Sequence, residues 1–224
     1  MPRTARRASG GMLFHVLNRG NARAQIFDDD EDYRAFQRVL TDTLLHVPMR
    51  ILAYCLMPNH WHVVLWPRED GDLGEFMRRV TTTHVRRWHL HRQSVGTGHL
   101  YQGTYKSFAI QKDEHLLTVC RYVERNPVRA KLVDKAEDWP WSSLWQRLHL
   151  ADGKGRPSLS EWPVAQPADW VEWVSRPETP TELEAMRGSV TRGRPYGEAS
   201  WQRRIAATLG LESTFRPRGR PRKI

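Results

Sequence analysis

Two histidines separated by one tryptophan, His60-Trp61-His62, carry the strongest chemical signal in the sequence. The flanking residues from Ala53 to Trp66 are mostly apolar or β-branched, a composition typical of β-strands. In a strand, residues two apart project from the same face, so both imidazoles would point the same way. Two imidazoles fixed side by side can hold a divalent metal ion.

The spacing by itself is a weak signal. Ten histidines in 224 residues give roughly 0.4 such triplets by chance. A second triplet, His89-Leu90-His91, lies in a stretch with helical periodicity, where residues two apart lie about 200° around the axis. We therefore assign a metal-binding geometry to the first triplet alone.

Tyr122 and Asn126 are four residues apart in a second chemically capable segment, which is predicted to be helical, and so lie on one side of the helix. Pro127 disfavours helical geometry at Asn126 and predicts a kink there. Two imidazoles and an amide oxygen suit Mg²⁺ or Mn²⁺ on a phosphate better than they suit a closed zinc site. A phenol is a competent nucleophile toward phosphate. A tyrosine on a helix edge is, however, most often a packing residue with a wet hydroxyl.

The elements that must position these residues follow from the apolar periodicity. Strands are predicted at 12–17, 50–57, 60–66 and 105–111, and helices at 28–46, 73–92 and 113–125. The first six elements have the order of a ferredoxin-like α+β fold, an antiparallel sheet with helices on one face. Trp61 would then face the helices, and His60 and His62 would face the free side of the sheet. Tyr54 is predicted to be structural.

Composition limits the class of protein. A hydrophobic content of 39% and a mean hydropathy of −0.66 fit a soluble protein. No apolar run approaches the roughly 18 residues that would span a membrane, and the basic N-terminus has no apolar stretch typical of a secretory signal. Cys55 and Cys120 lie in apolar patterns, which indicates buried thiols in a reducing environment. We expect a cytoplasmic protein with no membrane partner.

Positive charge is concentrated at the C-terminal end. Residues 187–224 hold ten Lys and Arg against two acids, most of the net charge of +10, which indicates a polyanionic partner, with nucleic acid the leading candidate. The alternative is a solvated disordered tail. The tetrad Arg-Gly-Arg-Pro occurs at 192–195 and 218–221 and resembles the AT-hook core, in which arginines enter a narrow minor groove. The candidate DNA-binding residues here are Arg192, Arg194, Arg218, Arg220 and Arg222.

Three regions are predicted along the chain: a catalytic domain at 1–148, an acidic segment rich in Trp and Pro at 149–186, and a basic DNA-binding extension at 187–224. The acidic segment is either a linker or a packing element. Within the extension, Trp201, Ile205 and Leu209 form a helical stripe that Gly210 can end. This helix is either half of a helix-turn-helix or, more commonly, simple packing.

Three motifs together resemble a known family: Leu56-Met57-Pro58-Asn59-His60-Trp61-His62, Tyr122 followed by Asn126-Pro127-Val128-Arg129-Ala130, and the turn Asn18-Arg19-Gly20. Over about residues 10–148 the sequence resembles the IS200-like single-tyrosine HUH transposases, and more narrowly the REP-associated tyrosine transposases of bacteria. The resemblance implies a metal ion, Mg²⁺ or Mn²⁺, held by His60, His62 and Asn126. It also implies that Tyr122 attacks single-stranded DNA to give a 5′-phosphotyrosine and a free 3′-hydroxyl.

Further expectations concern the partner. Single-stranded DNA or a hairpin from repetitive extragenic (REP) DNA is the expected substrate, with Arg19 as a DNA contact and Tyr101 stacking on bases from a loop. Two alternatives stay open: a non-catalytic nucleic-acid-binding regulator on the same scaffold, and a metal hydrolase of small substrates. The sequence leaves monomer and homodimer equally open.

Overall fold

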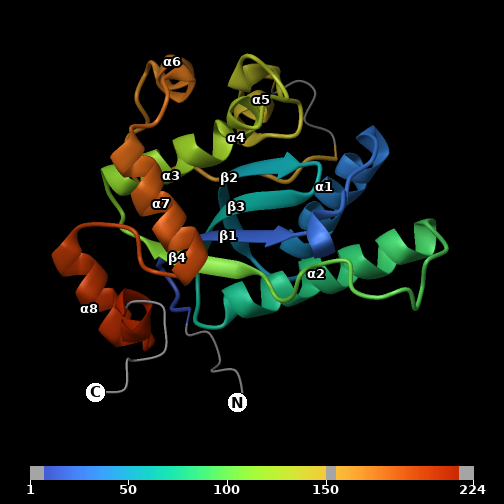
Figure 1. Cartoon of the computed structure of the whole chain (residues 1–224), viewed down its shortest axis with the longest axis horizontal. Coiled ribbons are helices and arrows are strands. Elements are labelled where there is room, and N and C mark those ends of the chain that lie inside the picture. The colour runs from blue at the N-terminus through green and yellow to red at the C-terminus, as the bar shows by residue number, and fades with distance from the viewer. Residues whose placement is uncertain (1–7, 150–154, 217–224) are drawn as a thin grey trace, which may run out of the picture.

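The architecture is seen in a computed structural model, which describes residues 8–149 and 155–216. Four strands form one antiparallel sheet in the order β2-β3-β1-β4 (Figure 1). The strands are β1 (Leu13–Arg19), β2 (Met49–Met57), β3 (His60–Pro67) and β4 (Lys106–Ile110). This order is that of a ferredoxin-like fold, so the predicted α+β class is confirmed.

Helices α1 (Asp30–Leu44) and α2 (Asp72–His91) pack together on one face of the sheet. Asp29 begins α1 by accepting a hydrogen bond from the Asp32 amide, as expected for an acidic cap. Trp61 points into this helix-covered core and is fully buried, as predicted. Because side chains alternate along β3, the neighbouring His60 and His62 face the other side of the sheet.

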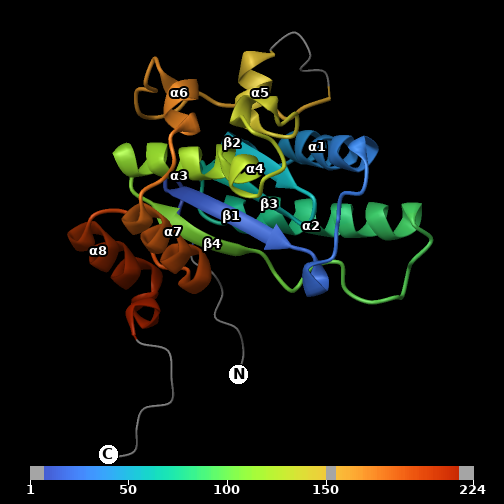
Figure 2. The same cartoon turned by 45° about the horizontal axis from the view of Figure 1, so that its top comes forward.

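The other face of the sheet is not free, which corrects the expectation from sequence. Helix α3 (Glu114–Glu124) packs across it, and helix α6 (Trp170–Ser175) adds to the same core (Figure 2). The physical reason lies in the strands, since the residues that alternate with the first core are also apolar. These residues include Leu52, Val64, Phe108 and Ile110, all buried. Strands that are apolar on both faces need cover on both.

The remaining elements wrap around this sandwich. They are η1 (Asn21–Arg23), α4 (Asn126–Arg129), η2 (Ala136–Asp138), α5 (Ser143–Leu148), α7 (Pro180–Arg192), α8 (Ala199–Leu209) and η4 (Glu212–Phe215). Helix α8 packs Trp201, Ile205 and Leu209 on the first core and ends at Gly210, which supports packing rather than a helix-turn-helix. The boundary predicted between 186 and 187 falls inside α7, so the acidic and basic segments share one helix.

The C-terminal half also bonds to both edges of the sheet. At the β2 edge, the Leu56 amide donates to the Trp141 carbonyl at 2.9 Å, and the Ser160 amide donates to the Ile51 carbonyl at 2.8 Å. At the β4 edge, Tyr196 exchanges backbone hydrogen bonds with Ala109 and Gln111 at 2.8 and 2.9 Å. At these positions the backbone groups of both edge strands are therefore paired within the chain.

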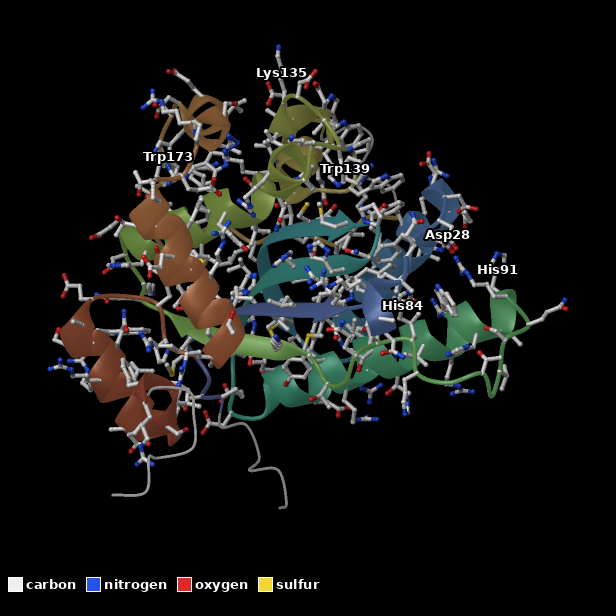
Figure 3. All side chains as sticks on the ribbon, viewed as in Figure 1. Asp28, His84, His91, Lys135, Trp139 and Trp173 are labelled. Carbon is white, nitrogen blue, oxygen red and sulfur yellow. The ribbon has the colours of Figure 1, made fainter. Side chains whose placement is uncertain are left out.

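The tryptophans of the acidic segment act as packing residues. The indole N–H of Trp162 donates to the Leu52 carbonyl at 2.9 Å, and that of Trp170 donates to the buried carboxylate of Glu124 at 2.7 Å. Trp173, also from this segment, lies on the same side of the molecule as Trp139, which precedes the segment (Figure 3). Of the two roles predicted for this segment, packing is therefore the one that the described residues fit.

Two smaller expectations concern buried groups and membranes. Cys55 and Cys120 are both buried free thiols, as predicted. Tyr54 is buried, and its hydroxyl bonds to the side chains of Gln37 and Gln146, which confirms a structural role. Among the described residues, no helix combines the length and apolar character needed to cross a membrane.

Candidate active site

A cavity of about 480 Å³ lies between one end of the sheet and helices α3 and α4. Residues from β1, β3, β4 and the loop before it, α3, α4 and α7 (Pro180–Arg192) line it, so elements from both halves of the chain meet at this cavity. The chemically capable residues of the lining are Arg19, His60, His62, Gln102, Lys106, Tyr122, Asn126 and Arg129. The two predicted motifs, sixty residues apart in the chain, therefore share one cavity.

His60 and His62 lie side by side on β3, with ring centroids 5.0 Å apart and an angle of 78° between their planes. Burial is the main cause that lowers the pKa of His60 to about 4. Burial also holds the pKa of His62 well below its usual range. Both imidazoles are therefore neutral near pH 7, which is the form that binds a metal ion.

The Nδ1 atom of each imidazole is held by a neighbouring side chain. His60 Nδ1 lies 2.6 Å from the Asn59 side-chain oxygen, and the Asn59 amide nitrogen donates to the Arg23 carbonyl at 3.3 Å. His62 Nδ1 lies 2.8 Å from Nε2 of His15, a fully buried histidine on β1. These contacts leave Nε2 of His60 and of His62 for an incoming ligand.

Tyr122 lies on the opposite wall of the cavity. Its ring centroid is 6.0 Å from that of His62, and the two planes are nearly perpendicular at 83°. The Asp113 side chain caps the start of α3 by accepting a hydrogen bond from the His115 amide, and α3 ends at Glu124. Tyr122 is therefore in the last turn of α3. The break between α3 and α4 falls at Arg125 and not at Asn126 as predicted, because Pro127 is accepted in the first turn of α4.

Asn126 begins α4 and also lines the cavity. Its side chain is 7% exposed, and its amide nitrogen has no hydrogen-bond partner among the described residues. Such an atom needs an explanation, because buried polar groups are nearly always paired. The unpartnered amide nitrogen is a hydrogen-bond donor, so it calls for an acceptor such as a phosphate oxygen and not for a cation. The donor set that fits a divalent cation with open positions is the two neutral imidazoles and the amide oxygen of Asn126.

Arg129 contacts both the ring and the backbone of Tyr122. Its guanidinium lies 4.0 Å from the centroid of the Tyr122 ring, and it donates to the Tyr122 carbonyl at 3.1 Å. The carboxylate of Glu178 pairs with Arg129 and lies 3.5 Å from Arg125. Glu182 pairs with Arg121 at 2.7 Å. Arg121, Arg125 and Arg129, spaced four residues apart, are here called the arginine ladder. Two acids from the C-terminal half thus balance their charge.

The arginine ladder is a feature that sequence reasoning missed. The spacing of Arg121, Arg125 and Arg129 places them on one side of α3 and α4, and this spacing is visible in the sequence. The acidic residues from Glu161 to Glu184 were also recognised, but nothing in their spacing links them to these arginines. The signal that links the arginines to the acidic residues is their opposite charge.

Two predicted DNA contacts near the cavity have different outcomes. Arg19 lines the cavity at the end of β1. Tyr101, in contrast, is buried, and its hydroxyl bonds to the Trp61 indole at 2.9 Å and to His84 Nδ1 at 2.5 Å. The prediction that Tyr101 stacks on bases is therefore wrong for this structure, because its ring belongs to the first core.

The AT-hook interpretation is wrong for the first Arg-Gly-Arg-Pro tetrad. Arg192 is the last residue of α7, and Gly193 ends the helix with φ of 71°. The guanidinium of Arg192 donates to the Arg216 carbonyl, and that of Arg194 donates to the Thr214 carbonyl at 3.2 Å. The tetrad is therefore a helix end that anchors the following chain, rather than an extended segment. Arg218, Arg220 and Arg222 lie outside the described residues.

A third group of metal-capable side chains lies elsewhere. Asp113, Glu114 and His115 come close together at the start of α3. Asp113 already accepts hydrogen bonds from the His115 amide and ring at 2.9 and 2.7 Å, so the geometry is explained by capping. We assign this group no function.

Comparison with known proteins places the chain in a family. Residues 9–126 match the family described as "Transposase IS200 like". A relative from Haemophilus influenzae is 23% identical over 163 residues, which cover 67% of this chain and 91% of the relative. A relative from Escherichia coli is 25% identical over 135 residues, covering 60% and 77%. Both relatives carry the words REP-associated tyrosine transposase in their names.

The fold comparison agrees with the sequence comparison. A solved structure titled "Structure of the REP associates tyrosine transposase bound to a REP hairpin" superposes with a TM-score of 0.53 and 22% identity. The match covers 75% of this chain and 93% of that one. These matches confirm the resemblance inferred from the motifs. Because the family match covers more than half of its length, the chain belongs to the IS200-like transposase family.

Proposed function

We propose that the protein cuts and rejoins single-stranded DNA, with Tyr122 as the nucleophile. The observation that carries the proposal is the single cavity lined by Tyr122, His60, His62 and Asn126. Membership of a transposase family supports DNA cleavage and transfer in general. The meeting of these four side chains in one cavity supports the tyrosine mechanism that the resemblance implies.

The cavity residues fit a divalent cation, Mg²⁺ or Mn²⁺, with His60, His62 and Asn126 as its protein ligands. When bound, such an ion polarises a phosphoryl oxygen and stabilises the negative charge that develops on it. Neutral imidazoles are suited to this role because they need not lose a proton before they bind.

The chain's own residues then perform the transfer. The phenolic oxygen of Tyr122 forms a bond to phosphorus, its proton passes to a base, and the bond from phosphorus to the 3′-oxygen breaks. The leaving oxygen takes up a proton to give a free 3′-hydroxyl, while the 5′-phosphate stays on Tyr122. Reversal with a new 3′-hydroxyl would rejoin the strand, since the phosphoester is conserved.

The positive residues around the cavity support a DNA substrate. Arg19 and Lys106 line it, and in this proposal they contact phosphates near the scissile bond. The net charge of +10 would favour association with a polyanion. The solved relative was bound to a REP hairpin, so we propose a structured single strand of this kind as the substrate here.

A covalent adduct is the direct test. The full chain is incubated with a labelled hairpin that carries a single-stranded extension, in the presence of Mn²⁺, and then resolved on a denaturing gel. A shifted, protease-sensitive band is expected from the wild type and from Tyr105→Phe, but not from Tyr122→Phe. Hairpin binding by Tyr122→Phe should stay near the wild-type level. An adduct formed by Tyr122→Phe would refute the assignment, and binding without any adduct would favour a non-catalytic regulator.

A further inference from the structure

His15 is a histidine in an otherwise apolar strand, Leu13-Phe14-His15-Val16-Leu17. It is fully buried, and the Phe108 ring packs on it with centroids 4.7 Å apart. Its Nε2 atom lies 2.8 Å from His62 Nδ1, whereas its Nδ1 atom has no hydrogen-bond partner among the described residues. A buried nitrogen without a partner costs stability, so packing alone would favour an apolar residue here.

The contact between the two rings restricts where their protons can be. A hydrogen bond between two ring nitrogens needs one nitrogen with a proton and one without. If His62 Nε2 is to bind a cation, the proton of the neutral His62 ring must be on Nδ1. His15 Nε2 must then be the acceptor. The contact therefore links the binding state of His62 to the orientation and proton position of His15.

We propose that His15 is a positioning residue that fixes the ring and the tautomer of His62 so that Nε2 of His62 is available to a divalent cation. The inference rests on the proposed function, because it concerns the ligands of that site. Asn59 makes the equivalent contact with Nδ1 of His60. Each of the two imidazoles thus has a hydrogen-bond partner on Nδ1, which leaves Nε2 for the cation.

The two partners come from different parts of the fold. Asn59 is adjacent to His60 in sequence and belongs to the turn between β2 and β3. His15 comes from β1, where its register partner is Val64, while His62 is opposite Leu17. His15 and His62 are therefore diagonal neighbours on one face of the sheet, a distance that long side chains can bridge. The pairing of β1 with β3 is what brings this partner to the site.

Metal affinity without DNA tests the inference. Mn²⁺ binding to the full chain is measured by calorimetry for wild type, His15→Phe and His15→Gln. His15→Phe retains a ring of similar shape but removes the acceptor, so the dissociation constant should rise by about 10-fold to 100-fold. Gln can place an oxygen near the position of Nε2, and His15→Gln should recover most of the affinity. His84→Phe, which alters another buried histidine, is the matched control and should bind as the wild type does.

The outcomes separate this inference from the proposed function. Wild-type affinity in a folded His15→Phe variant would overturn the role of His15 and leave the metal site intact. A wild-type chain that binds no Mn²⁺ would overturn both. Nitrogen NMR shifts of the Mg²⁺-bound protein give a second readout that does not depend on a variant folding. A proton on Nδ1 of His62 supports the inference, and a proton on Nε2 of His62 overturns it.

Discussion

The two walls of the candidate active site are built by different physical means. On the strand wall, His60 and His62 are neutral, buried, and held by hydrogen bonds to Asn59 and His15. On the helix wall, Tyr122 is held by a charged group, Arg129, whose charge is balanced by Glu178. The strand wall is assembled within the core sheet, whereas the helix wall depends on residues about fifty positions downstream.

The difference shows that the C-terminal half is part of the site and not an accessory to it. Its acids neutralise arginines on the helix that carries the nucleophile. Glu178 is 4% exposed at its side chain, and the paired guanidinium groups of Arg125 and Arg129 are 12% and 22% exposed. Charges this deep are screened less by salt than surface pairs are. Removal of one partner therefore leaves an uncompensated charge.

The largest effect is expected on the strand wall. Replacement His62→Ala removes a proposed ligand outright, so the dissociation constant for Mn²⁺ should rise by more than about 100-fold, the upper end of the effect of losing a supporting partner. The matched control is His91→Ala, from the second His-x-His triplet on α2. That variant should bind Mn²⁺ as the wild type does. Equal losses in the two variants would show that the strand geometry does not select the ion.

The next effect concerns the helix wall. Replacement Glu178→Gln removes the charge that balances Arg125 and Arg129, and should lower the free energy of unfolding by about 2 kcal/mol, less than a fully buried pair would lose. It should also slow adduct formation by Tyr122. The control is Glu172→Gln, whose pair with Arg176 is exposed on both sides, and its effect should stay below about 0.5 kcal/mol. Denaturant unfolding measures the stability of the two variants. Equal losses of unfolding free energy would contradict the claim that Glu178 balances the arginine ladder.

A pH-dependent effect, smallest near neutral pH, is expected from the buried neutral histidines. Burial lowers the pKa of His84 on α2 to about 3, whereas an unfolded histidine titrates near pKa 6.5. Below about pH 6.5 the unfolded state binds a proton that the folded state does not, so stability is lost as the pH falls. The loss per histidine should approach about 1.4 kcal/mol per pH unit.

Variants of two histidines on α2, both labelled in Figure 3, isolate the contribution of His84 to the pH dependence of stability. Replacement His84→Phe should reduce the slope of unfolding free energy against pH by about 1.4 kcal/mol per unit between about pH 4 and pH 5.5. His91→Phe, at an exposed position, should leave the slope unchanged. An unchanged slope in His84→Phe would show that His84 is protonated in the folded protein.

Local patterns were enough to predict much of the fold and the strand wall. Alternation in β3 separated Trp61 from His60 and His62, because a period of two residues follows from strand geometry alone. The helix carrying Tyr122 was likewise predictable from apolar spacing, and the proline ring indicated a nearby break, which the structure has at Arg125 and not at Asn126. These features need no knowledge of distant partners.

Features that depend on distant contacts were not predictable. Tyr101 looked like a loop residue available to DNA, yet Trp61 and His84 take up its hydroxyl inside the core. The tetrad at 192–195 looked like an extended arm, yet it ends a helix and bonds to Thr214 and Arg216. In both cases the hydrogen-bond partners lie outside the local sequence, 17 and 40 residues from Tyr101 and 20 and 24 residues from the two arginines. Tertiary context then decides the conformation.

The pairing of both sheet edges has a consequence for self-association. Strand addition is a common way for two copies of a protein to join, since an exposed edge presents a row of free amides and carbonyls. Here Trp141 and Ser160 occupy positions along one border and Tyr196 along the other. A second copy that added a strand at these positions would first have to break the backbone hydrogen bonds that these residues make within the first molecule. Strand addition at these positions is therefore disfavoured.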